Sequence, residues 1–270
     1  MSDKKQKIGL CLGGGAARGY ALLPIIQNLT RSNFVPRAVS GCSVGALVGA
    51  YYCLYGEVKT LNDKVKEMRK RDFINLLDLR NPKKSLLKGN KIKKFLQLLY
   101  REATFDDLQI PLIVATTKLP DFKTKYITSG KLVDAVMASI SIPGIFPPYQ
   151  LDKEYLIDGQ ITQHIPYQEL FKRYRIDKAL VVDLISGVDY TKSDIKDLSA
   201  LDIVLGSFYS LMKTSKIDHS FSKKIYIMTP QYDKNSVLGS LRFDKFDSNY
   251  WAGEEIWNKS KTDLDKFLNL

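Results

Sequence analysis

Cysteine, histidine and long apolar runs are all scarce in this 270-residue sequence. Its three cysteines, Cys11, Cys42 and Cys53, show no metal-ligand spacing and leave one without a partner, so they indicate reduced thiols in a cytoplasmic protein. The first mostly apolar run, Ile8–Leu12, is too short for the core of a secretory signal. Since no run approaches the ~18 apolar residues of a membrane span, we expect any membrane contact to be peripheral, at the inner face.

Recognisable metal sites are missing too. The only two histidines, His164 and His219, form no cluster with the cysteines, and the chain has no aspartate-rich calcium loop. We therefore expect neither a metal nor another cofactor.

Acidic residues are in the minority, with 29 Asp and Glu against 41 Lys and Arg, which gives a net charge of +12. Such a surplus favours an anionic partner, either nucleic acid or an acidic membrane surface. The alternative is a solvated basic surface without a specific partner.

Short apolar runs alternate with helical patterns along the chain, and no repeat, low-complexity tract or linker interrupts them. This alternation predicts one α/β domain with a mostly parallel sheet between helical layers. It would span residues 1–270, with a catalytic core at about 8–185 and a C-terminal extension of helices and strands at about 190–270. The expected strands are Ile8–Leu12, Arg37–Cys42, Leu112–Thr116 and Ala179–Leu184; the expected helices lie near Tyr20–Thr30, Val44–Leu54, Leu132–Ser139, Leu198–Lys213 and Trp251–Phe267.

The first chemical motif is Gly41-Cys42-Ser43-Val44-Gly45, between a predicted strand and an Ala/Gly-rich helix. A nucleophile on a tight strand-to-helix turn needs small flanking residues because the backbone there is strained and crowded. The helix that follows would also direct its positive end at the serine. Alone, the pattern also fits any glycine-rich turn, but this context favours Ser43 as a nucleophile.

The second motif, Gly13–Gly19, follows the first predicted strand directly. Consecutive glycines let backbone N–H groups approach a ligand oxygen, so the loop fits either an oxyanion hole or a phosphate cradle. The dinucleotide pattern is broken because Ala16 takes the place of its middle glycine and no acidic ribose ligand follows about 20 residues later. A loop that is glycine-rich only for packing is the remaining alternative.

The third motif is Ile157-Asp158-Gly159-Gln160, which follows the segment Ala138–Pro148. An Asp-Gly pair taken alone usually marks a turn. Asp158 therefore becomes a candidate site residue because of the other motifs in the chain and not because of this pair alone.

Together these segments resemble the patatin-like phospholipases, especially the bacterial branch related to neuropathy target esterase. That family carries a glycine-rich loop ending in Arg-Gly, a G-x-S-x-G nucleophile, an A-S-x-S-I-P-G-x-F-P-P segment and a final D-G-G or D-G-A motif. The counterparts here are Gly13–Gly19, Gly41–Gly45, Ala138–Pro148 and Asp158-Gly159, with weaker echoes at Thr104–Leu108 and Ile110–Leu112. The resemblance covers roughly residues 8–185.

The resemblance implies a three-layer α/β/α fold and a serine lipid acyl hydrolase in which Ser43 attacks and Asp158 serves as its base. It implies acyl esters of phospholipids or lysophospholipids as substrates, no metal, and no nucleic-acid partner. We hypothesise that the oxyanion is bound by the N–H groups of Gly14, Gly15, Ala16 and Val44. Gly13, Arg18, Gly41, Gly45 and Gly159 would support the site, although Arg18 equally fits a structural role.

Three departures from the family pattern concern the surroundings of the site. Ala16 stands where many members have a fourth consecutive glycine. Leu22 and Pro24 replace a common His and Gly. Gln160 replaces the last Gly or Ala of the aspartate motif, where it would narrow the pocket or bond the Asp158 carboxylate.

The scarcity of histidine bears directly on the mechanism. A serine triad could be assembled from Ser43, Asp158 or Asp183, and His219. However, His219 lies in a polar segment typical of a surface loop, and His164 follows Asp158 so closely that loop packing explains its proximity. We therefore expect a Ser43–Asp158 dyad. Because a free aspartate is a weak base, with a pKa of ~3.9, it would need desolvation, a strong oxyanion hole or both.

The segment Asn81–Arg101 combines basic and apolar residues. Its apolar members Ile92, Phe95, Leu96 and Leu99 follow helical spacing. Such a helix either lies on an anionic bilayer or packs its apolar face on the core. The lysines that would touch the membrane are Lys83, Lys84, Lys88, Lys91, Lys93 and Lys94.

Two other functions remain open from the sequence. One keeps the chemistry and changes the substrate, as a thioesterase or acyltransferase acting on acyl-CoA or an acyl carrier protein. The other is a non-catalytic nucleotide- or lipid-binding domain, against which the intact Ser43 and Asp158 argue.

Overall fold

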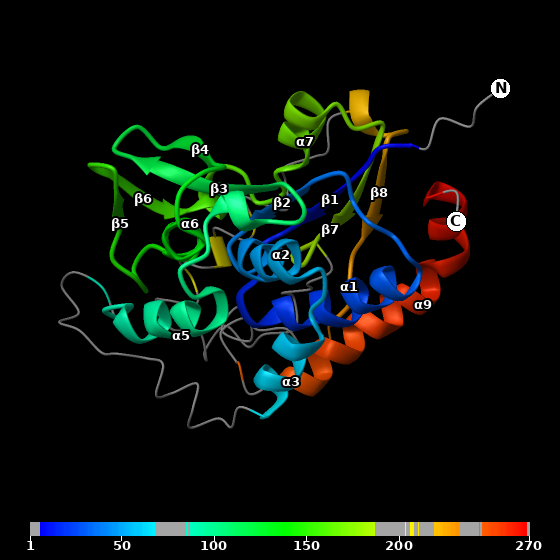
Figure 1. Cartoon of the computed structure of the whole chain (residues 1–270), viewed down its shortest axis with the longest axis horizontal. Helices are drawn as coiled ribbons and strands as arrows, with labels where there is room; N and C mark the ends of the chain where they lie inside the picture. Colours follow the sequence, from blue (N-terminus) through cyan, green and yellow to red (C-terminus); the bar gives the residue numbers. More distant parts are fainter. Residues whose placement is uncertain are drawn as a thin grey trace.

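The computed structural model describes residues 6–67, 85, 87–186, 203, 206–207, 210, 219–232, 243 and 245–268. Most of the predicted helix Leu198–Lys213 lies outside the described residues, as do Lys83 and Lys84. Figure 1 shows a central sheet with helices on both sides of it.

Eight strands form one mixed sheet in the order β5-β6-β3-β2-β1-β7-β8, with β4 paired to β3. The pairs β1–β2, β1–β7, β2–β3 and β7–β8 are parallel, whereas β4 and β6 run antiparallel to β3. The strands are β1 (Ile8–Leu12), β2 (Val39–Cys42), β3 (Leu112–Leu119), β4 (Lys123–Ile127), β5 (Tyr149–Leu151), β6 (Glu154–Asp158), β7 (Lys178–Val182) and β8 (Ile225–Met228).

The α-helices are α1 (Leu22–Arg31), α2 (Val44–Tyr55), α3 (Lys59–Glu67), α5 (Asn90–Tyr100), α6 (Leu132–Ser139), α7 (Tyr167–Tyr174) and α9 (Phe246–Leu268). Short 3-10 turns are η1 (Ala16–Ala21), η2 (Phe105–Asp107), η3 (Gly159–Ile161) and η5 (His219–Phe221).

The period-two alternation of the central strands divides the core between the two faces of the sheet. In β1, Leu10 and Leu12 belong to the larger apolar cluster, shared with α1, α2, α6 and α9, whereas Cys11 faces the smaller cluster under α7. In β7, Leu180 and Ala179 divide in the same way. Burial on both faces explains why these strands are almost continuously apolar, and the predicted α/β class is confirmed.

The last helix belongs to the same core as the sheet. Trp257, Leu264 and Leu268 of α9 are buried in the larger cluster, and α9 packs along η1, α1 and β8 (Figure 1). The C-terminal part of the chain therefore helps to hold the loop that follows β1.

One feature of the sheet positions the site. Residues Val114–Lys118 of β3 pair with β4 along one edge. Along the other edge, β2 pairs with β3 as far as Ala115. The pairing with β6 takes over at Thr116, whose partner is Asp158, the last residue of β6. Because β2 and β6 approach each other head to head, the residues at their carboxyl ends meet.

Candidate active site

Ser43 stands alone on the sharp turn between β2 and α2. Its backbone has φ 54° and ψ −125°, a conformation that costs a non-glycine residue about 1–3 kcal/mol and persists only when its surroundings impose it. A Cβ on Gly45 would lie 2.2 Å from the carbonyl oxygen of Leu12, and one on Gly41 would lie 2.6 Å from that of Gly45. Both glycines are therefore required by close backbone contact, as the motif predicts.

Ser43 and Asp158, 115 positions apart, meet directly. The Ser43 hydroxyl donates a hydrogen bond of 2.7 Å to Oδ2 of Asp158, and the two residues are only 2% and 1% exposed. The other carboxylate oxygen accepts from the backbone N–H of Gln160 at 2.9 Å and contacts Sγ of Cys42 at 3.8 Å. The carboxylate is thus held on both oxygens, with one of them aimed at the hydroxyl proton.

The environment makes this carboxylate a stronger base than a free one. Burial raises the pKa of Asp158 from 3.8 to about 7, against the opposing effect of hydrogen bonds from Gln160, Ser43 and Cys42. Desolvation disfavours the charged form, so the proton affinity of the carboxylate increases. This is the help that an aspartate base requires.

Neither histidine enters the pair. His219 is exposed in η5, in agreement with the surface position expected from its polar segment. His164 is buried near Asp183, and burial lowers its pKa. The Asp183 carboxylate instead accepts hydrogen bonds from the backbone N–H groups of Ile185 and Ser186, at 2.9 and 3.1 Å. The structure therefore brings the expected dyad together and assembles no triad around Ser43.

The glycine loop between β1 and η1 lies against the start of α2. A Cβ on Gly19 would come 2.2 Å from the Val44 side chain. The N–H of Gly13 bonds to the carbonyl of Val182 at 2.9 Å, which continues the sheet and leaves this group no role in an oxyanion hole. Within the described residues, no acceptor bonds the N–H of Gly14, Gly15 or Val44.

Ala16 adopts a backbone conformation that suits glycine. Its φ is 49°, in the left-handed region, where an L-residue with a side chain pays roughly 1–2 kcal/mol. This explains in physical terms why the family pattern places glycine here. This departure from the family pattern therefore carries a cost in backbone strain.

Gln160 connects the two halves of the site. Its backbone N–H bonds the Asp158 carboxylate, and its side chain, 6% exposed overall, lies on Gly14, where a Cβ would be 2.4 Å from the side-chain amide carbon. The residue does bond the carboxylate, as one of the two predicted roles requires. It does so through its backbone, which any residue would supply.

The described structure also places two residues near the site that the sequence did not single out, Asn249 and Tyr232. Asn249 of α9 is buried, and its side-chain amide donates to the carbonyl of Ala17 at 3.1 Å. The ring of Tyr232 has its centre 5.7 Å from the guanidinium of Arg18, which is 2% exposed. Neither contact follows a sequence pattern.

No group of three or more His, Cys, Asp or Glu side chains that could hold a metal ion occurs in the described part of the chain. Among those same residues, no helix has the length and apolar character needed to cross a membrane.

The fold and the buried serine–carboxylate pair provide the arrangement that a serine hydrolase requires. Residues 10–171 match the family model of the patatin-like phospholipases. The neuropathy target esterase sws of Drosophila melanogaster is 32% identical over 211 residues, covering 76% of this chain and 14% of that protein. Its counterpart in Drosophila grimshawi is 33% identical over 164 residues, covering 59% and 11%. The chain belongs to the patatin-like phospholipase family.

The solved structures agree at the level of the fold. VipD from Legionella pneumophila superposes with a TM-score of 0.52 and 14% identity, covering 94% of this chain and 67% of that chain. The chain spans only 14% of the length of the Drosophila melanogaster relative, so the likeness concerns a segment of that larger protein.

Proposed function

We propose that this chain hydrolyses the carboxylic esters of phospholipids or lysophospholipids, with Ser43 as nucleophile and Asp158 as its base. The observation that carries the proposal is the 2.7 Å hydrogen bond from the Ser43 hydroxyl to a buried carboxylate. A general base must lie within hydrogen-bond reach of the proton that it removes. Membership of a lipid acyl hydrolase family supports the substrate class.

The reaction would proceed through an acyl-enzyme. Ser43 Oγ attacks the ester carbonyl carbon while its proton passes to Oδ2 of Asp158. The tetrahedral intermediate then collapses, and the leaving alcohol takes that proton as its bond to the carbonyl carbon breaks. Water attacks the acyl-serine in the same way, again giving a proton to Asp158. The collapse of the second intermediate returns this proton to Ser43 and releases the fatty acid.

The negative charge that develops on the carbonyl oxygen needs donors placed in advance. The N–H groups of Gly14, Gly15, Ala16 and Val44 are our proposed donors, because the glycine loop and the first turn of α2 converge beside Ser43. The N-terminus of α2 adds a favourable dipole at the same point.

The serine assignment is tested by labelling with a fluorophosphonate probe, which reacts with activated serines. Wild-type protein should be labelled and should hydrolyse p-nitrophenyl esters. Ser43→Ala should lose both activities and Asp158→Asn nearly all turnover, with circular dichroism unchanged. Retained turnover in Ser43→Ala would remove Ser43 from the mechanism.

The substrate class is tested by comparing hydrolysis of lysophospholipids, diacyl phospholipids and acyl-CoA by the same preparation. We expect the oxygen esters of the lipids to be cleaved with the higher kcat/KM. A preference for acyl-CoA would instead support the thioesterase alternative. Absence of both labelling and ester turnover in folded protein would instead support the non-catalytic binding domain.

We also propose that α5 contributes to contact with an anionic membrane. The four apolar residues of the predicted stripe face the core: Leu96 and Leu99 are buried, and Ile92 and Phe95 pack against it. The exposed face instead carries Leu98, which is 74% exposed, together with Lys91 and Lys94. Lys88 is exposed just before the helix.

Lys93 is tied to neighbouring elements of the fold. Its ammonium group lies 3.0 Å from Asp134 of α6 and 2.6 Å from the Tyr149 hydroxyl of β5. It therefore joins α5 to neighbouring elements and is not included in the proposed membrane surface. A charge reversal at Lys93 would test the anchoring of the helix rather than membrane binding.

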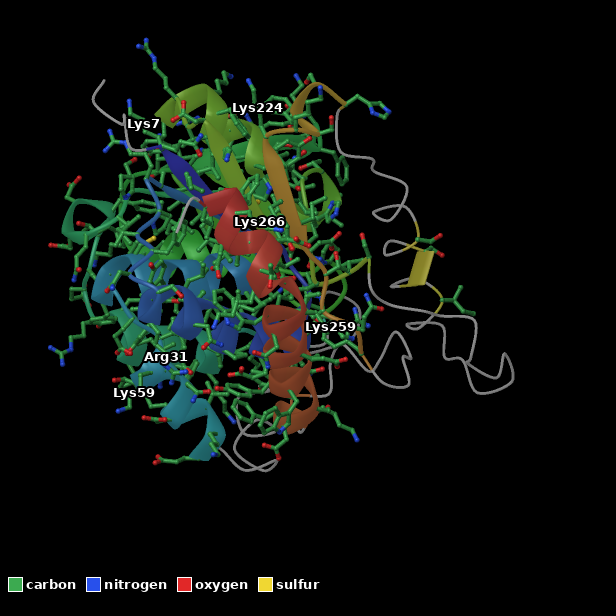
Figure 2. The ribbon with its side chains drawn as sticks, turned by 90° about the vertical axis from the view of Figure 1, so that its right-hand side faces the viewer. Lys7, Arg31, Lys59, Lys224, Lys259 and Lys266 are labelled. Carbon is green, nitrogen blue, oxygen red and sulfur yellow. The ribbon has the colours of Figure 1, made fainter. Side chains whose placement is uncertain are left out.

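Basic side chains elsewhere provide a control for this proposal. Figure 2 shows labelled Lys and Arg residues spread along the α9 side of the molecule, well apart from α5 in Figure 1. The double change Lys91→Glu and Lys94→Glu should weaken binding to phosphatidylglycerol-containing vesicles more than Lys259→Glu with Lys266→Glu, which alters net charge equally. Equal losses would mean that only overall charge matters.

A further inference from the structure

The chain leaves α6 through Ser139-Ile140-Ser141, and this short segment touches the backbone of both dyad residues. The Ser139 hydroxyl accepts a hydrogen bond of 2.8 Å from the backbone N–H of Ser43. Two residues later, the backbone carbonyl of Ser141 accepts one of 2.9 Å from the N–H of Asp158. The two serines are 0% and 1% exposed, so solvent does not compete for either contact.

The Ser139 hydroxyl is itself fixed on the sheet. It donates 2.7 Å to the carbonyl of Ala115 in β3, the residue next to the one that pairs with Asp158. Both its donor and its acceptor capacity are therefore used. The strand that carries Asp158 pairs with Thr116 of β3, and the turn that carries Ser43 is bonded through Ser139 to the neighbouring residue Ala115.

We propose that Ser139–Ser141 is a clamp that sets the separation of Ser43 and Asp158, and that Ser139 is its positioning residue. This inference rests on the proposed function of the dyad. Ser43 holds a strained φ of 54°, which must be stabilised by its surroundings. The hydrogen bond from its N–H to Ser139 is a specific contact that does so.

The clamp also gives the backbone N–H of Ser43 a structural role. Because this group already donates to Ser139, it does not point into an oxyanion hole in this arrangement. The donors left beside the nucleophile are those of the glycine loop and of Val44. The N–H of Ser43 thus holds the nucleophile in place, whereas the N–H groups of the glycine loop and of Val44 are the proposed donors to the developing charge.

The two serines provide a matched pair for testing this idea. The Ser139 side chain makes the contact to Ser43, whereas the Ser141 side chain donates only to the carbonyl of Met137, at 2.8 Å, and its contact with Asp158 is made by the backbone. Ser139→Ala and Ser141→Ala each remove one buried hydroxyl, at positions two residues apart in the chain. Both should lose some thermal stability, and only the first removes a contact to the nucleophile.

We expect Ser139→Ala to lower kcat for ester hydrolysis and the rate of fluorophosphonate labelling by about 10–100-fold, as a misplacement of the order of 1 Å does. KM should stay close to the wild-type value, because Ser139 holds the nucleophile and is not among the proposed contacts to the substrate. Ser141→Ala should stay within about threefold of the wild type, a change of less than 1 kcal/mol by transition-state arithmetic.

Equal activities of the two variants, whether both high or both low, would overturn the role of Ser139. Ser43→Ala is measured beside them to separate this inference from the proposed function. If Ser43→Ala is inactive and Ser139→Ala matches Ser141→Ala, the dyad stands and the clamp fails. If Ser43→Ala keeps its activity, both fail.

Discussion

At the scale of single residues, burial converts Asp158 from a weak base into a useful one. Desolvation of the carboxylate brings its pKa to about 7, close to neutral pH. A base with such a pKa is ionised in about half of the molecules at neutral pH and binds a proton more strongly than a free aspartate. It also titrates in the range usually assigned to histidine, so a neutral midpoint in a rate profile does not by itself identify an imidazole here.

The pKa of Asp158 predicts the acid limb of the rate profile. Because the base must be ionised in the free enzyme, kcat/KM should fall about tenfold per pH unit below a midpoint near pH 7 and level off above it. The measurement is kcat/KM for a p-nitrophenyl ester, whose intrinsic reactivity at each pH is subtracted with Ser43→Ala. A profile that stays flat down to pH 5 would contradict the raised pKa.

The positive φ of Ala16 predicts an effect on stability. Ala16→Gly relieves left-handed strain of roughly 1–2 kcal/mol but loses a buried methyl group. Ala17→Gly, the next position, loses a buried methyl group without any such relief. The free energy of unfolding in urea should therefore be about 1–2 kcal/mol higher for Ala16→Gly than for Ala17→Gly. Equal values would mean that Ala16 is unstrained.

At the scale of elements, α5 shows how an amphipathic pattern divides between core and surface. Its apolar stripe packs on the core, which was one of the two interpretations of the sequence. Lys93 lies on the side of the helix that meets α6 and β5, where it reaches Asp134 and Tyr149. Helical spacing alone does not show which lysine finds a partner on another element.

The contacts of Lys93 predict a stability difference within this helix. Lys93→Met should lower the free energy of unfolding by about 0.5–1 kcal/mol, a modest value because the pair is partly exposed. Lys94→Met, at an exposed position of the same helix, should stay within about 0.5 kcal/mol of the wild type. Urea unfolding of both variants measures the difference, and a larger effect at Lys94 would refute the anchoring role of Lys93.

The central elements could be predicted from the sequence because their signals are strong. Short buried apolar runs, helical spacing and glycine motifs marked β1, α2 and α6, and the helix Leu132–Ser139 has the predicted bounds. The antiparallel strands β4, β5 and β6 were not predicted. They have three to five residues each, and many of their residues are partly or fully exposed. Their sequences therefore lack a clear apolar run.

The site was predictable to a similar degree. Ser43 and Asp158 were identified because family motifs surround them. Ser139 lies within the segment Ala138–Pro148 that the resemblance identified, but the hydrogen bond that it accepts from the N–H of Ser43, like that from Asn249 to the carbonyl of Ala17, joins groups far apart in the chain. Such contacts impose no periodicity or spacing on a single sequence, so only the folded arrangement reveals them.

At the scale of the whole molecule, the sheet brings distant parts of the chain to one point. β2 and β6 meet end to end on β3, and α9 supports the loop beside them through Asn249. The net charge of the chain is +12, and in α9 Lys259 and Lys266 lie near Glu255 and Asp263 of the same helix (Figure 2). Overall charge would attract an anionic surface, while the site itself depends on burial.

The most direct test of the central claim is the pH dependence of kcat/KM in a variant without histidine, His164→Gln with His219→Ala. Circular dichroism establishes that it is folded. Because the serine proton passes directly to a carboxylate 2.7 Å away, we predict wild-type kcat/KM within a few-fold and the same midpoint near pH 7. Activity reduced to that of Ser43→Ala in the folded variant would show that an imidazole is the base.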